Sequence, residues 1–131
     1  MYSFPIGVMV ESFRLPLNEA IKKAAELGAA GLQMHATRGE TAADVCVGAK
    51  RKELLAYVKA NGLVFSALCG DFGKGFGNPE LNPELIEKSK RIIDLAKDLE
   101  TDIVTTHIGV VPEDPNHPRY QIMQEACYSL A

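Results

Sequence analysis

Apolar and polar positions alternate along this chain in a fixed order: a short apolar run, a polar loop, then an amphipathic stretch. The first apolar run, residues 6–10, predicts a strand buried on both faces. The amphipathic stretch that follows predicts a helix that begins near Pro16 and is ended by Gly28. Its apolar residues recur at helical spacing: Leu17, Ala20, Ile21, Ala24 and Leu27.

The same order recurs three more times. Further strands are predicted at residues 31–35, 63–68 and 103–106. Further helices are predicted at 50–60, at 82–99 with Asn82 as N-cap and Pro83 as first residue, and from about Arg119. Strands that alternate with helices predict an α/β fold of four parallel βα units with right-handed crossovers. Ligands in such folds bind at the carboxyl ends of the strands.

The fourth predicted strand carries the first candidate for chemistry. Asp102 to Gly109 has a β-branched core and turns polar at His107, which is typical of a buried strand that delivers a side chain to a binding face. A neutral imidazole offers one donor and one acceptor, so His107 is a candidate catalytic residue that orients a hydroxyl or a metal-bound water. The alternative is a hydrogen-bonded histidine without a chemical role.

Other candidates follow the earlier strands, and we interpret them as substrate-binding residues. Glu11 can bind a hydroxyl or a cation, or form an ion pair with Arg14. Gln33 and His35 lie on one face of their strand, either in contact with substrate or in a polar layer inside the fold.

Two further substrate-binding candidates lie in loops. Asp71 belongs to a glycine-rich loop that is expected to close over a ligand. Arg119 follows the fourth strand and can contact a phosphate bidentately, or belong to a solvated, proline-stiffened loop.

Composition narrows the function. The chain has 131 residues, 47% hydrophobic and 24% charged, with a net charge of −3, as expected for one globular domain spanning residues 1–131. It has no extended basic block and no apolar run of transmembrane length, so we expect neither nucleic acid nor membrane as a partner. The three cysteines are widely spaced, which argues against a disulfide framework or a zinc site and favours the cytoplasm.

Four βα units are half of a barrel of about 250 residues. A four-stranded sheet on its own has two open edges, which favour homo-oligomers. The chain is therefore part of a longer protein, pairs with a second copy, or forms an open flavodoxin-like sheet. We favour the first. The flavodoxin-like sheet needs a phosphate-binding loop after its first strand, and residues 11–14 are a poor candidate for one.

Several stretches resemble a known family. They are Gly7-Val8-Met9-Val10, the helix from Leu17 to Gly28, Ala30-Gly31-Leu32-Gln33-Met34, and Thr105 to Pro112. Over essentially its whole length the chain resembles the N-terminal half of the xylose-isomerase-like TIM barrels, which include sugar-phosphate isomerases and epimerases and endonuclease IV. The resemblance implies a (βα)8 barrel and a divalent metal (Mn, Mg or Zn). It places the metal ligands and catalytic carboxylates mainly on strands five to eight. We therefore assign no metal ligand to this chain, and we expect that the chain alone binds no metal ion.

The resemblance implies a sugar or sugar-phosphate isomerase or epimerase that uses metal-assisted proton transfer next to a carbonyl. Most of its catalytic groups would lie in the C-terminal half, so we expect the 131-residue chain to be inactive alone. One alternative is a non-catalytic half-barrel that dimerises and binds a small ligand. Another is a nuclease like endonuclease IV, which has histidines closing strands three and four; this chain has Cys69 at the first position and matches only His107.

Overall fold

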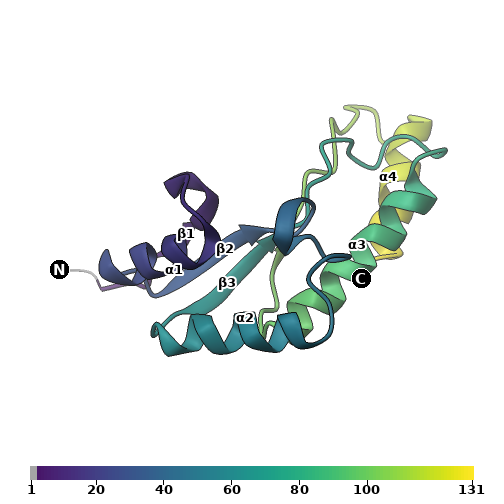
Figure 1. Ribbon diagram of the computed structural model, residues 1–131. Helices are drawn as coiled ribbons and strands as arrows, with labels where there is room; N and C mark the ends of the chain where they lie inside the picture. Colours follow the sequence, from purple (N-terminus) through teal and green to yellow (C-terminus); the bar gives the residue numbers. More distant parts are fainter. Residues whose placement is uncertain (1–2) are drawn as a thin grey trace.

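The computed structural model describes residues 3–131 and contains one four-stranded parallel sheet (Figure 1). Its strands are β1 (Gly7–Met9), β2 (Gly31–His35), β3 (Val64–Cys69) and β4 (Val104–Thr105). They lie in the order β1-β2-β3-β4. A doubly wound sheet reverses its strand order, whereas a TIM barrel keeps sequence order. The predicted α/β fold of four parallel βα units is confirmed, and the flavodoxin-like alternative is wrong.

The helices follow the strands as predicted. They are α1 (Leu17–Glu26), α2 (Ala49–Ala60), α3 (Asn82–Asp98) and α4 (Pro118–Tyr128), with 3-10 turns at Val10–Phe13 and Gly39–Thr41. Gly28 has a φ of 79° and Gly62 a φ of 74°. Such left-handed conformations favour glycine, which is why α1 and α2 end where the sequence indicates.

The core lies between the sheet and three of the helices. Leu32, Met34 and Leu68 point from β2 and β3 into this layer and are 0% exposed. They pack against buried residues of α1, α2 and α3 such as Ile21, Val58 and Leu95. The helix α4 packs elsewhere, against the start of α3 and the glycine-rich loop, through Phe76, Leu85 and Ala126.

The opposite face of the sheet is largely open. Val64 is 57% and Ile103 54% exposed, and β1 is only partly buried. The prediction that residues 6–10 are buried on both faces is therefore wrong. The fourth strand is also shorter than predicted: β4 contains only two residues, and Thr106 and His107 beyond it are exposed. Within residues 3–131 this strand pairs with β3 alone, so the β-branched residues around it lack a second ladder partner.

The start of α3 differs by one residue from the prediction. The helix begins at Asn82, its N-cap is Leu81, and no side chain caps it. The Asn82 amide instead donates a buried hydrogen bond of 2.9 Å to the carbonyl oxygen of Phe76. This contact ties the glycine-rich loop to the helix. No helix in residues 3–131 is both long and apolar enough to cross a membrane.

Candidate functional site

The carboxyl ends of β1 and β2 are joined by a side chain. Glu11 lies in the 3-10 turn after β1, and its Oε1 accepts a hydrogen bond of 2.7 Å from the backbone N–H of His35. The possible ion pair with Arg14 does not form among the described residues. Glu11 is therefore oriented toward the end of β2, where parallel sheets bind ligands.

His35 ends β2 and borders two cavities. One, of about 340 Å³, is also lined by Glu11 and Thr41. The other, of about 370 Å³, is also lined by Arg38 and Asp71. The Nδ1 atom of His35 is buried without a hydrogen-bond partner in residues 3–131. An unpaired buried polar atom is unfavourable, and the residue that carries this one lies at the edge of both cavities.

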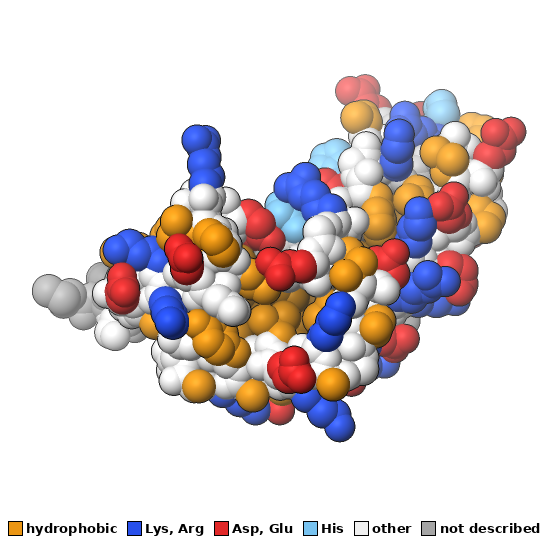
Figure 2. All heavy atoms as spheres, viewed as in Figure 1, with side chains coloured by type: hydrophobic (Ala, Val, Ile, Leu, Met, Phe, Trp, Pro, Cys, Tyr) orange, Lys and Arg blue, Asp and Glu red, His pale blue; other side chains and the backbone are white. Residues whose placement is uncertain are grey.

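Asp71 is positioned by its own loop. Its Oδ1 accepts a hydrogen bond of 2.8 Å from the backbone N–H of Gly73, an Asx turn that short acidic side chains favour. The structure thus brings Glu11, His35 and Asp71 around adjoining cavities at one edge of the sheet. In Figure 2 acidic, basic and histidine side chains gather along the hollowed upper edge of the molecule, between the turn after β1 and the loops before α4.

Gln33 has a different environment. Its Nε2 donates a hydrogen bond of 2.9 Å to the Thr105 hydroxyl on β4, and that hydroxyl lies 3.4 Å from the carbonyl oxygen of Leu68. This network crosses the open face of the sheet and matches the polar-layer interpretation of Gln33. Sequence reasoning missed Thr105, although it lies two residues before His107 and hence on the same face of the predicted strand.

The structure does not bring the two remaining candidates to these cavities. His107 is exposed beyond the end of β4 and lines neither cavity. Arg119 lies in the first turn of α4, where its backbone N–H donates to Nδ1 of His117 at 3.1 Å. His107 therefore lies in the loop before α4 and Arg119 in the first turn of α4, and neither belongs to the cluster around His35.

The residues at this edge do not form a metal centre by themselves. No group of three or more His, Cys, Asp or Glu side chains in residues 3–131 is arranged to hold a metal ion. Cys69 ends β3, at the position where the endonuclease branch has a histidine. The donor set in this part of the chain therefore does not fit the metal expected for the intact barrel.

Four parallel βα units in sequence order, with polar groups at the carboxyl ends of the strands, define half of a TIM barrel with its ligand-binding edge. Residues 21–130 match the family described as Xylose isomerase-like TIM barrel. The chain belongs to this family, and the resemblance seen in the sequence is confirmed.

Two solved structures have the same fold. A xylose isomerase domain protein from Planctomyces limnophilus is 22% identical with a TM-score of 0.76, over 97% of this chain and 49% of that protein. The probable 3-DHS dehydratase AsbF, involved in petrobactin synthesis in Bacillus anthracis, is 17% identical with a TM-score of 0.65, over 95% and 45%. The chain spans about half the length of these structures. No curated protein matches it significantly.

Proposed function

We propose that this chain forms the substrate-binding half of a sugar or sugar-phosphate isomerase or epimerase. The observation that carries this proposal is the group formed by Glu11, His35 and Asp71 around the cavities at the carboxyl ends of the strands. Two carboxylates and an imidazole supply the acceptors and donors that neighbouring sugar hydroxyls need. The family, and the xylose isomerase domain named for one structural relative, support a sugar as substrate.

Each residue of the group has a defined task. Glu11 uses one oxygen to hold the backbone of His35 and presents the other to a hydroxyl. The imidazole of His35 borders both cavities and contacts the sugar from the end of β2. Asp71 binds from the glycine-rich loop. His107 lies outside this group, beyond the end of β4, and we assign it a supporting role.

The proton-transfer groups belong to the other half of the proposed barrel. The family leads us to expect a divalent metal, which polarises a carbonyl oxygen when bound. Residues 3–131 contain no group of three or more His, Cys, Asp or Glu side chains arranged for such an ion, so we assign binding and orientation to this chain. Its three free cysteines agree with a reducing compartment, and we propose a cytoplasmic location.

A chimeric barrel tests the proposal. This chain is fused to the half of the Planctomyces limnophilus protein that it does not match, and ketoses are incubated with the purified fusion and Mn²⁺ in D₂O. Deuterium appearing next to the carbonyl, measured by NMR, is the expected result. The 131-residue chain alone should give none. A folded chimera that neither binds nor exchanges ketoses would contradict the proposed function.

A matched pair of substitutions locates the binding group. Glu11→Gln keeps the oxygen that accepts from His35 and removes the charge. We expect it to raise KM by about tenfold, because a charged hydrogen bond to substrate is lost. Glu19→Gln makes the same chemical change on the exposed surface of α1 and should leave KM unchanged. If the two substitutions changed KM equally, Glu11 would not be part of the substrate-binding site.

A second candidate function is a half-barrel that dimerises and binds a small ligand without catalysis. The exposure of Val64 and Ile103 on the open face of the sheet favours it. Sedimentation equilibrium decides this point, since pairing through that face requires a dimer. A strict monomer with a folded spectrum would exclude self-completion of the barrel.

A further inference from the structure

Arg119 is held between two loops that meet above the sheet. A β-carbon added to Gly77 would collide with Nε of Arg119, and one added to Gly109 would lie 3.6 Å from its NH2. The loops also touch each other: the backbone N–H of Phe76 donates to the carbonyl oxygen of Ile108 at 2.9 Å. Figure 1 shows the two loops running together toward α4. Two glycine backbones therefore flank the guanidinium.

The guanidinium has no partner in the described part of the chain. Its Nε is buried and unpaired. No ion pair within residues 3–131 involves Arg119, and no side-chain hydrogen bond starts from its guanidinium. Its terminal nitrogens do not appear among the buried unpaired atoms, so they reach solvent. An arginine stays charged at any ordinary pH, and its planar donors match a carboxylate or a phosphate.

We propose that Arg119 forms an oxyanion-binding site between the loop before α3 and the loop before α4. It takes the phosphate or carboxylate of a ligand, and the glycines leave room for the guanidinium beside the backbone. This inference rests on the proposed function in one respect: the anion is assigned to the substrate, which makes it a sugar phosphate or a sugar acid. A charge-assisted bidentate contact then selects such a substrate over a neutral sugar.

The site itself is tested on the 131-residue chain with inorganic phosphate. Phosphate is titrated at constant ionic strength while backbone amides are followed by NMR, and saturable shifts at Gly77 and Gly109 are expected. Arg119→Gln should weaken binding about tenfold or more. Arg91→Gln, an exposed arginine on α3, should leave binding unchanged and serves as the control for net charge.

Two further variants separate binding from a purely structural role. Gly77→Ala keeps the charge of Arg119 but displaces the guanidinium, so it should also weaken binding. Arg119→Lys keeps the charge without the planar fork and should bind with intermediate affinity. These two variants decide the question if Arg119→Gln does not fold. Phosphate affinity that is the same in every variant, or shifts that do not saturate, would overturn the proposal.

The chimeric barrel tests whether the bound anion is part of the substrate or is free phosphate. If the substrate supplies it, Arg119→Gln raises KM for a ketose phosphate about tenfold and leaves KM for the neutral ketose unchanged. An equal effect on both substrates would overturn the assignment to the substrate. Phosphate binding by a chimera that exchanges no sugar proton would refute the proposed function and leave an anion site for free phosphate.

Discussion

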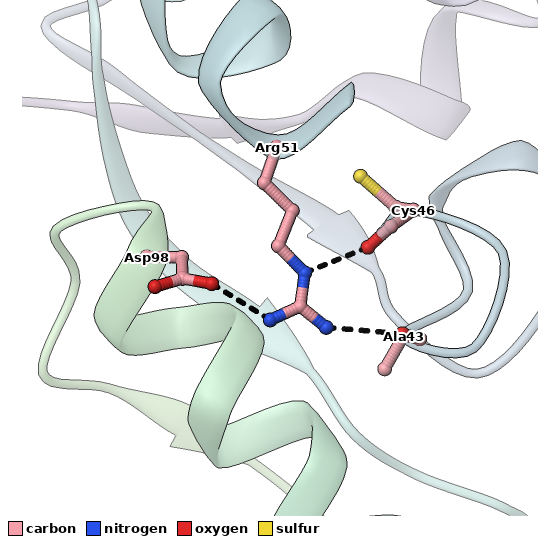
Figure 3. Close-up of polar contacts among 4 residues, drawn as sticks. All are labelled: Ala43, Cys46, Arg51 and Asp98. Carbon is pink, nitrogen blue, oxygen red and sulfur yellow. Dashed lines mark hydrogen bonds and ion pairs between the residues drawn. The ribbon is translucent and has the colours of Figure 1, made fainter. Parts of the chain in front are cut away.

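Arg51 connects the loop that lines the candidate site to two helices, and its removal is the sharpest test of the fold. Its Nε donates to the Cys46 carbonyl oxygen at 2.7 Å and its NH2 to the Ala43 carbonyl oxygen at 3.2 Å, while NH1 pairs with Asp98 at 2.8 Å (Figure 3). Ala43 and Cys46 belong to the loop between β2 and α2. The same loop carries Arg38, which lines the cavity beside His35 and Asp71. We therefore expect Arg51→Met to destabilise the loop that lines this cavity as well as the packing of the core.

The contacts of Arg51 are unequal in strength. The two carbonyl bonds are partly buried and start from a charged donor, so each contributes about 1–2 kcal/mol. The pair with Asp98 contributes less than about 1 kcal/mol, because the Asp98 side chain is 57% exposed. Arg51→Met should thus lower the free energy of unfolding by about 3 kcal/mol, and Asp98→Asn by no more than about 1 kcal/mol.

Equilibrium unfolding in urea measures both free energies. Because carbonyl bonds dominate, the loss in Arg51→Met should persist at high salt, where exposed ion pairs are screened. If Asp98→Asn costs as much as Arg51→Met, the ion pair dominates and the reasoning fails. A cost below about 1 kcal/mol for Arg51→Met would show that the loop does not depend on this side chain.

Three other predictions concern buried groups. Burial raises the pKa of the Cys46 thiol, although Arg51 and Lys50 partly oppose the shift. The contribution of this thiol to the free energy of unfolding is therefore fully present below the unfolded pKa of about 8.5 and decreases as the pH rises above it. Cys46→Ala should remove this decrease when unfolding in urea is measured at a series of pH values. Thiol labelling should modify exposed Cys127 quickly and buried Cys46 only on unfolding, which mass spectrometry of timed samples checks. Gly70→Ala places a β-carbon 2.9 Å from Val104 Cγ1 and should lower the thermal midpoint through a cost of about 1–3 kcal/mol.

Elements with a strong local pattern could be predicted from the sequence. The strand at 31–35 matches β2, and Gly28 and Gly62 end their helices as expected. The predicted length of the fourth strand was wrong because strand length depends on pairing. The β-branched run is typical of a strand, but only Val104 and Thr105 pair with β3. Local pattern reports what a residue favours, whereas a ladder needs a neighbour from elsewhere in the chain.

The contacts that decide where α3 begins could not be predicted from the sequence either. The sequence Asn82-Pro83-Glu84 has a strong capping pattern, yet the Asn82 side chain bonds to Phe76. A tertiary hydrogen bond replaced the local one, which a short sequence window does not reveal. The position of Arg119 between Gly77 and Gly109 is a similar case, because it depends on two loops that meet only in the folded chain.

The candidate site shows why structural and functional interpretations of one residue were hard to separate. The sequence offered Glu11 either as a ligand-binding group or as part of a local ion pair. In the structure one oxygen, Oε1, holds the end of β2, and Asp71 uses Oδ1 in the same way on its own loop. Within residues 3–131 the second oxygen of each carboxylate makes no hydrogen bond to the protein. A carboxylate fixed through one oxygen loses little further conformational freedom when the other binds a hydroxyl. The backbone bond is therefore what prepares each acid for a ligand, and Glu11→Gln, which keeps the bond and removes the charge, separates the two roles.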